Sequence, residues 1–504
     1  MQRSNSKRIA KNTTLLYVRM LFIMLINVFS VRFVLKGLGV VDYGVFNVVA
    51  SFVTMFSGLS SIISSATLRF HSYSIGKGKE EKVSDVFTAS FNISAFLCLA
   101  ILIIGEIIGI WFINSKMVIP ADRLAAANWV YQLSVLTFIV LLLTSPFTAV
   151  IFAYEKMQLF SVISIVECVF KFLLAISLLY ISFDHLIFYG VGLLLIAIAH
   201  FLVYFIFIAK SGKIKYKKHV EKSLYKQMLA FSGWTLFSSS ASIGMSQLVT
   251  MITNVFFGPI VNAARAIAFQ LSTAINSFTN NIVLAIKPPI IKYYAEGDYD
   301  RVNRYFSFAN KAIFFSMTLI LLPIFFEMEI VLKLWLDVND AQTILFSRLI
   351  VIYVFILALN NPIAIVVQAT GHIRAYSTYV EVPTLLCFPL TWLMYWLGFP
   401  AESAFYIMIV AIIFSHIIRL VCLKRLFTTF SYREYIINFM LPAFLVLLLS
   451  SFILIAVNRI MIVGYARLFI SLAIAFLAVG IISLSIGFNK SERKTLFAIF
   501  KINA

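Results

Sequence analysis

Three arginines lie inside or at the start of long apolar stretches, and they are the residues of this chain best suited to binding chemistry. Arg19 and Arg32 fall in the first stretch and Arg265 begins a later one, and neither stretch contains an acid. A charge near the middle of a bilayer costs about 2.5 to 3.5 kcal/mol, so it faces water, a partner or a transport pathway. Because a guanidinium pairs with phosphate oxygens, these arginines predict an anion-binding surface. For Arg32 and Arg265, which lie near a stretch end, anchoring at the membrane interface is the alternative.

Amide side chains accompany these arginines along the same stretches. Asn27 shares a polar sector of a helix with Arg19, and Gln247 and Asn254 lie seven residues apart on one face. We regard these amides as candidates for binding a substrate, with hydrogen bonding between neighbouring helices as the alternative. The full set is Asn27, Gln247, Asn254, Asn276 and Asn280.

Two prolines occur late in apolar stretches, within Thr144-Ser-Pro146 and Asn360-Asn-Pro362. A proline inside a helix removes one backbone hydrogen bond and bends the helix. Pro146 and Pro362 are therefore hinge candidates, although bends also occur in helices that do not move.

Two acids follow these prolines, and either could couple transport to an ion. Glu167 precedes Lys171 by one helical turn, which also predicts a self-neutralised ion pair, and Glu381 stands alone. His200 and His416 are isolated, and we expect each to be a packed polar residue rather than a metal ligand.

The composition requires a membrane to surround these residues. The 504 residues are 62% hydrophobic and 12% charged, whereas soluble domains have about half apolar and a quarter charged residues. Apolar stretches long enough to cross a hydrocarbon core of roughly 30 Å recur, and we predict about fourteen transmembrane helices. The predicted spans are 13–36, 43–67, 86–113, 127–153, 159–182, 186–209, 228–256, 262–286, 311–335, 347–370, 376–398, 403–423, 437–457 and 467–488.

The net charge of +20 is a signal of topology rather than of nucleic-acid binding. Most Lys and Arg residues fall in alternate loops, including the basic segment 210–226, and short cytoplasmic loops retain positive charge. We therefore expect both termini to be cytoplasmic. We interpret the first stretch as a retained span, because it lacks a small-residue cleavage site.

The chain repeats itself along its length. Gly78 to Phe87 matches Gly297 to Phe306 at one constant offset, which also places Gly39 opposite Gly258. The repeat joins spans of the same direction, so it predicts two pseudo-symmetric six-helix bundles around a central cavity. The predicted divisions are residues 1–209 and 228–427 for the bundles, 210–227 for a cytoplasmic linker, and 428–504 for two further helices with a cytoplasmic tail.

No enzyme signature is present in the sequence. There is no glycine-rich phosphate loop and no metal-ligand spacing, and Cys98, Cys168, Cys387 and Cys422 lie in or beside apolar stretches as small filler. The longest predicted outer loop, 114–126, is short for a membrane enzyme of polysaccharide assembly. We expect no catalytic residue, cofactor or metal.

Several motifs resemble the O-antigen-type polysaccharide flippases of the multidrug, oligosaccharidyl-lipid and polysaccharide exporter superfamily. The resemblance covers nearly the whole chain and implies a MATE-like fold in the bacterial inner membrane. It also implies a sugar unit linked to undecaprenyl pyrophosphate as the substrate, moved between leaflets by alternating access, with membrane lipids and polysaccharide assembly proteins as partners. The motifs are Asn12-Thr-Thr-Leu-Leu-Tyr-Val-Arg19, Leu38-Gly-Val-Val-Asp-Tyr-Gly44, Ser65-Ala-Thr-Leu-Arg-Phe70, Phe256-Phe-Gly-Pro-Ile-Val-Asn-Ala-Ala-Arg265 and Leu332-Lys-Leu-Trp-Leu336.

The resemblance also bears on individual residues and on the rival functions. The similar lipid II flippases use arginines in their first and eighth helices, and Arg19 and Arg265 occupy corresponding places. Ser246-Gln-Leu248 and Lys287-Pro-Pro289 depart from the family pattern. A cation-coupled multidrug exporter is the main alternative, but such exporters bury carboxylates in the first bundle and the first span here has none. A lipid II flippase and a membrane enzyme of polysaccharide assembly are further alternatives.

Overall fold

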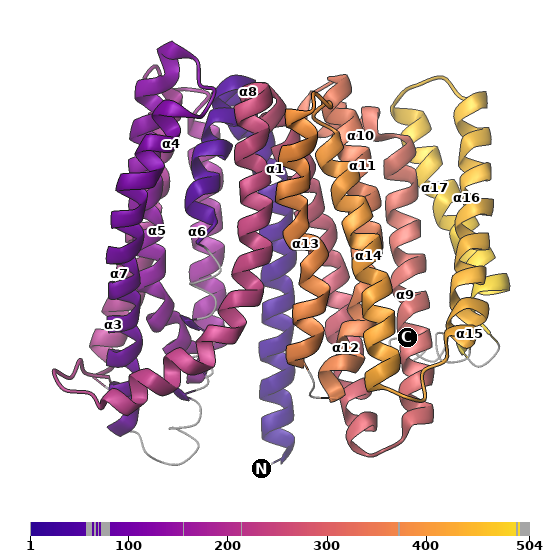
Figure 1. Cartoon of the computed structure of the whole chain (residues 1–504), viewed down its shortest axis with the longest axis horizontal. Coiled ribbons are helices and arrows are strands. Elements are labelled where there is room, and N and C mark those ends of the chain that lie inside the picture. Colours follow the sequence, from indigo (N-terminus) through magenta and orange to yellow (C-terminus); the bar gives the residue numbers. More distant parts are fainter. Residues whose placement is uncertain are drawn as a thin grey trace. The chain divides into compact units, whose positions relative to one another are not determined.

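The computed structural model describes residues 2–56, 63–64, 67–68, 70–71, 81–154, 156–212, 214–370, 373–489 and 492–493, and side chains are described for only part of α1, α3, α6, α8 and α13. Every regular element within these residues is a helix (Figure 1). The chain forms two compact units, Met1–Ala266 and Ile267–Ala504. The predicted limits of the bundles at residues 209 and 228 stay predictions.

Unit 1 is built from long helices that pack side by side. α5 packs against α7 and α3, and α6 packs against α1 and α7. Its elements are α1 (Gln2–Thr54), α3 (Glu81–Ile104), η1 (Gly105–Gly109), α4 (Ile110–Ser115), η2 (Ala121–Arg123), α5 (Leu124–Ala153), α6 (Met157–Ser177), α7 (His185–Ser211) and the first part of α8 (Lys222–Ala295).

Unit 2 contains the end of α8 and the remaining helices. α13 packs against α14, and α16 and α17 pack against α9. Its elements are α9 (Tyr299–Phe326), α10 (Met328–Leu336), α11 (Ala341–Ala358), α12 (Asn360–Thr370), α13 (Ile373–Trp396), α14 (Ser403–Leu426), α15 (Tyr432–Tyr435), η3 (Ile436–Met440), α16 (Leu441–Ile460), α17 (Tyr465–Ile482) and η4 (Ser483–Gly487).

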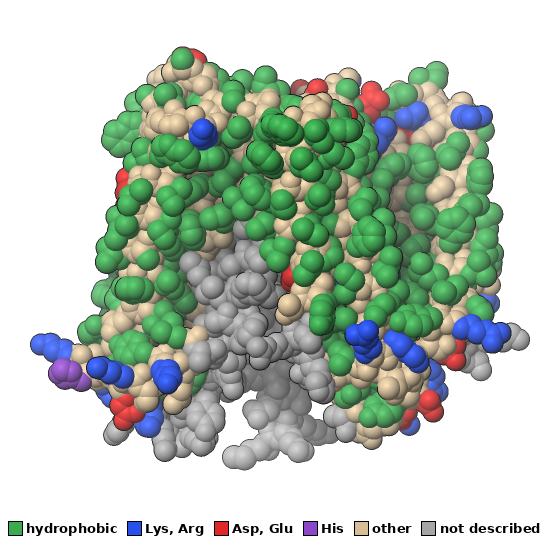
Figure 2. All heavy atoms as spheres, viewed as in Figure 1, with side chains coloured by type: hydrophobic (Ala, Val, Ile, Leu, Met, Phe, Trp, Pro, Cys, Tyr) green, Lys and Arg blue, Asp and Glu red, His purple; other side chains and the backbone are tan. Residues whose placement is uncertain are grey.

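The helices confirm a multi-pass membrane protein. Eleven described segments are long and apolar enough to cross a bilayer. Only 17% of the most apolar stretch of α7 is buried. Hydrophobic side chains cover the visible flank of unit 1 (Figure 2). Lys and Arg side chains gather where α7 ends and α8 begins. In water such a surface would drive aggregation, so lipid must surround it.

Glycines resolve the helix count. α1 and α8 each join two helices, across Gly39 (φ 77°, ψ 167°) and Gly258 (φ 79°, ψ −175°). Backbone with φ of this sign is open to glycine but strained for other residues. With these two segments divided at their glycines and α13 counted as well, the described helices are roughly consistent with the predicted count of about fourteen. The two glycines have almost the same conformation, as expected for equivalent positions of a repeat.

An arginine joins three elements of unit 1 near one end of the bundle. The Arg123 Nε donates to Asp42 Oδ1 at 2.7 Å, and its Nη1 donates to Asp184 Oδ2 at 2.7 Å. Asp184 also caps α7 by accepting from the N–H groups of Leu186 and Ile187. Burial alone would raise the Asp184 pKa, but the Arg123 and backbone hydrogen bonds lower it below its usual value.

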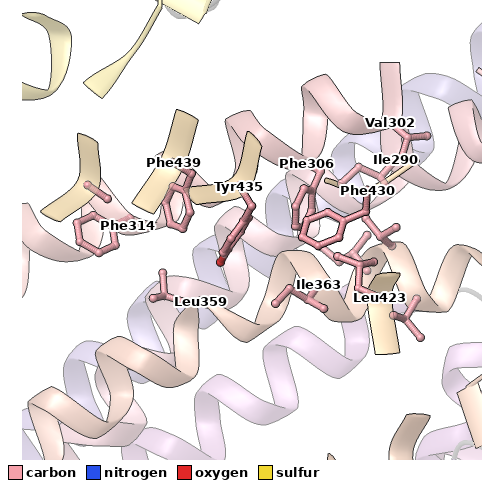
Figure 3. Close-up of a cluster of buried hydrophobic side chains, with 14 of the residues drawn as sticks. Ile290, Val302, Phe306, Phe314, Leu359, Ile363, Leu423, Phe430, Tyr435 and Phe439 are labelled. Atoms are coloured by element: carbon pink, nitrogen blue, oxygen red, sulfur yellow. The ribbon is translucent and has the colours of Figure 1, made fainter. Parts of the chain in front are cut away.

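Aromatic packing holds the last helices onto unit 2. Figure 3 shows the rings of Phe306, Phe314, Phe430, Tyr435 and Phe439 gathered between helices. The Phe306 and Tyr435 rings stack with centroids 6.1 Å apart, and the Phe314 and Phe439 rings meet edge to face at 5.9 Å. The segment α15–η3 therefore packs firmly on α9.

Two ion pairs supplement this packing. Arg467 on α17 binds Glu327 at the end of α9 with an N···O distance of 2.8 Å, and Ser471 donates to the other Glu327 oxygen at 2.9 Å. Lys311 on α9 binds Glu492 at 2.8 Å. Glu327 is fully buried and the Lys311 side chain is only 4% exposed, so both pairs are largely buried.

Candidate functional site

Arg19 lies in a polar centre of unit 1 formed with side chains of α6 and α7. Its guanidinium carbon lies 4.4 Å from the centroid of the Phe160 ring, a cation–π contact. Glu167 Oε1 accepts from Lys171 Nζ at 2.7 Å, and Glu167 Oε2 lies 3.4 Å from His200 Nδ1. We call Arg19, Glu167, Lys171, His200 and Tyr204 the α6–α7 polar centre.

Arg265 lies in a second polar region of unit 1, beside the Gly258 break in α8. Its side chain is 1% exposed, and its Nε donates to Thr250 Oγ1 at 3.2 Å. The Asn262 amide, oriented to satisfy both of its ends, donates to the Thr250 carbonyl oxygen and accepts from the Asn254 N–H. The Thr250 hydroxyl thus holds Arg265 against the part of α8 that precedes Gly258, and Asn262 joins the same two parts of the helix.

Asn254 makes contacts that the sequence did not indicate. Its Oδ1 accepts from the Val118 N–H at 2.8 Å, and its Nδ2 donates to the Val118 carbonyl oxygen at 3.2 Å. The side chain is fully buried. Asn254 therefore fastens α8 to the segment between α4 and η2.

The other predicted binding residues are less enclosed. Arg32 is exposed, and Asn27 is exposed with its Oδ1 3.8 Å from Cys168 Sγ. Gln247 is half-buried. Asn276, in unit 2, is half-buried and donates to Ser272 Oγ at 3.3 Å. The side chain of Asn280 lies outside the described residues.

The two hinge candidates occupy different local structures. Pro146 is buried within the continuous helix α5. Pro362 is buried near the start of α12, and the helix is interrupted at Leu359 between α11 and α12. The interruption agrees with the loss of a backbone hydrogen bond near a proline, while hinge motion stays a prediction for both.

Histidines of the two repeats have different partners, a contrast that sequence reasoning missed. His416 Nδ1 lies 2.7 Å from Asn360 Oδ1, and its Nε2 lies 3.4 Å from Tyr435 Oη. His200 faces Glu167 instead. The signal was available, because the same number of residues separates His200 from His416 as separates Pro146 from Pro362.

The described residues form no metal site, and the large cavity of unit 2 lies apart from the predicted binding residues that the structure describes. The described residues contain no group of three or more His, Cys, Asp or Glu placed to hold a metal. A cavity of about 990 Å³ in unit 2 is lined by residues of α8, α9, α15, η3 and the C-terminal segment, including Arg301, Arg304 and Glu434. None of the predicted binding residues whose side chains the structure describes lines it.

Solved structures with the same helix arrangement are transporters and flippases. The lipid II flippase MurJ, in an inward closed conformation, aligns with a TM-score of 0.70 over 94% of this chain and 98% of its own, at 14% identity. An inward-facing multidrug resistance MATE family transporter of the MOP superfamily aligns at 0.57 over 82% and 96%, with 14% identity. A Vibrio cholerae MATE transporter aligns at 0.53 over 83% and 98%, with 16% identity. This chain has the MurJ and MATE fold.

Sequence comparison adds one curated relative. The uncharacterized membrane protein EpsK of Bacillus subtilis (strain 168) is 22% identical over 302 residues, which are 59% of this chain and 59% of EpsK. The chain thus matches little more than half the length of that relative. No family model matches the sequence.

Proposed function

We propose that this protein is a flippase that moves a lipid-linked oligosaccharide across the bacterial cytoplasmic membrane by alternating access. The substrate is a polysaccharide repeat unit on a polyprenyl pyrophosphate, bound through its phosphates. The two bundles are residues 1–209 and 228–427, joined by the linker 210–227, and both termini lie in the cytoplasm. Membrane lipids and polysaccharide assembly proteins are its partners.

The observation that carries this proposal is the charge of the helix before Gly39 and of the helices on both sides of Gly258. Arg19 and Arg265 lie on α1 and α8, and residues 1–41 and 228–290 contain no Asp or Glu. Arg265 is almost fully enclosed by protein. Cations held without acids on the same helices suit an anionic headgroup and disfavour a cationic drug.

The length of the structural match supports the same choice. MurJ aligns over 94% of the chain, whereas the MATE transporters align over 82% or 83%. A fold alone does not assign a substrate. A lipid substrate is nevertheless consistent with a chain whose length matches a lipid flippase more fully than it matches the exporters.

A liposome assay tests the proposal directly. The purified protein is reconstituted with a fluorescent polyprenyl-pyrophosphate oligosaccharide in both leaflets, and a membrane-impermeant quencher reports its movement. Wild type, Arg19→Ala, Arg265→Ala and the matched control Arg459→Ala are compared, since Arg459 is exposed at the end of α16. A charge-assisted hydrogen bond contributes about 1.5 to 3 kcal/mol, so each binding-site variant should lose about tenfold or more in rate.

Two outcomes would contradict the proposal. Wild type that extrudes cationic dyes and moves no pyrophosphate lipid, with ion gradients applied, would identify a multidrug exporter. Equal rates for Arg459→Ala and the two binding-site variants would show that the arginines do not contact the substrate. Size-exclusion profiles of all four proteins establish that folding is unchanged.

A further inference from the structure

The α6–α7 polar centre contains buried groups that make no hydrogen bond. Tyr204 is fully buried and its hydroxyl has no hydrogen bond, and neither ring nitrogen of His200 has one. The Arg19 Nε is also buried without an acceptor. Each buried, unsatisfied polar group costs about 1 to 3 kcal/mol. Three potential donors therefore meet in one region of unit 1.

The acceptors within the centre are already engaged. Glu167 is its only carboxylate, with one oxygen bound to Lys171 and the other facing His200. The His200 ring lies 4.8 Å from the Tyr204 ring, centroid to centroid. Tyr204, Glu167 and Cys168 are titratable side chains that interact electrostatically with Arg19. A ligand that brings several acceptor oxygens would satisfy the donors that remain.

Among the described residues, α5 adds no charge to the centre and α1 adds that of Arg19. α5 packs against both α6 and α7 and has no charged residue between Leu124 and Ala153. Cys168 on α6 is a further titratable side chain beside Arg19. With neutral imidazole the formal charge of Arg19, Lys171 and Glu167 together is one positive unit. A proton on His200 raises it to two.

In the second repeat, His416 makes a polar contact through each of its ring nitrogens. His416 is bonded to an amide and lies beside a phenol, both neutral groups. His200 instead lies 3.4 Å from a carboxylate oxygen, where a proton would create a charge-assisted hydrogen bond. The sequence offset between His200 and His416 equals that between Pro146 and Pro362, and of the two histidines only His200 faces a carboxylate.

We propose that the α6–α7 polar centre binds a phosphate of the lipid-linked substrate, and that protonation of His200 strengthens this binding. Arg19 and Tyr204 donate to the phosphate oxygens, and protonated His200 adds a positive charge. By reciprocity, a bound phosphate favours the proton as much as the proton favours the phosphate. The inference rests on the proposed function and adds His200 and Tyr204 to the substrate site.

The test measures binding against pH for the full-length protein in nanodiscs. The probe is a short-chain polyprenyl-pyrophosphoryl-N-acetylglucosamine, because both of its phosphates are diesters whose charge stays constant over the range used. Affinity, measured from about pH 5 to about pH 8, should fall about fivefold to tenfold as the pH rises and His200 loses its proton. His200→Gln should abolish this dependence, and the matched control His416→Gln should retain it. Tyr204→Phe should weaken binding about threefold to tenfold at every pH through the lost hydroxyl.

A wild-type affinity that does not change with pH, or a pH dependence that persists in His200→Gln, would overturn the inference while leaving the flippase proposal intact. No binding at any pH by correctly folded wild type would instead overturn the proposed function. If His200→Gln does not fold, proton uptake on binding to wild type, measured calorimetrically in buffers of different ionisation enthalpy, decides the matter: uptake supports the inference and none refutes it. UDP-N-acetylglucosamine, which has the pyrophosphate diester without the lipid chain, shows whether the phosphates or the lipid chain provide the affinity.

Discussion

At the scale of single residues, the same side-chain type has different roles in this protein. Asn254 is fully buried with both amide groups on the Val118 backbone, whereas Asn27 is exposed. Arg123 is engaged by two carboxylates, while the Arg19 Nε has no acceptor. Residue type and helical spacing do not separate these cases, because the partners come from segments far away in the sequence.

Asp184 provides a prediction at this scale. Its pKa is lowered in the folded protein, so its contribution to stability is full above the unfolded-state value and is lost as pH falls through the folded value. Thermal unfolding of the solubilised protein should therefore show a loss of stability below about pH 4. Asp184→Ala should remove this part of the acid response and cost about 1 kcal/mol at neutral pH through the lost helix cap. An unchanged acid profile in the variant would refute the assignment.

At the scale of elements, close backbone contact joins the two glycine-broken helices. A Cβ added at Gly44 would clash with the carbonyl oxygen of Pro259, the residue that follows the Gly258 break. The nearby hydrogen bonds between Asn254 and Val118 hold the same part of α8 to the segment between α4 and η2. Shape complementarity here is between backbones, so side-chain adjustment cannot relieve an added atom.

Gly44→Ala should therefore destabilise the protein by about 1 to 3 kcal/mol and lower transport. Gly480→Ala is the control, because Gly480 lies in helix α17 with nothing within 4 Å of an added Cβ. That substitution should be neutral or stabilising by up to about 1 kcal/mol. Thermal unfolding and the liposome assay measure both effects, and equal behaviour of the two variants would count against the contact.

At the scale of the whole molecule, the last two helices are part of unit 2 rather than a loose addition. Aromatic rings join α15–η3 to α9, and the Glu327–Arg467 and Lys311–Glu492 pairs join the C-terminal segment to the same helix. Buried ion pairs resist separation because a lone charge left in an apolar region is costly.

Glu327→Leu alone should destabilise the protein by about 3 to 5 kcal/mol, because Arg467 would keep an uncompensated charge. The double variant Glu327→Leu with Arg467→Met should recover most of that loss, since it removes both charges together. Differential scanning fluorimetry of wild type, both single variants and the double variant tests this. Additive losses in the double variant would show that the two side chains act independently.

Local composition was enough to predict the membrane helices and their repeat. Apolar stretches, proline positions and the alignment of Gly39 with Gly258 depend on nearby residues and on backbone conformation, which the chain carries everywhere along its length. The partner of each polar residue depended on tertiary packing. His200 faces Glu167 while His416 meets Asn360 and Tyr435, and Asn254 bonds a backbone far away in the sequence. Hydrogen bonds act over about 3 Å, so only the packing of distant helices decides which donors and acceptors meet.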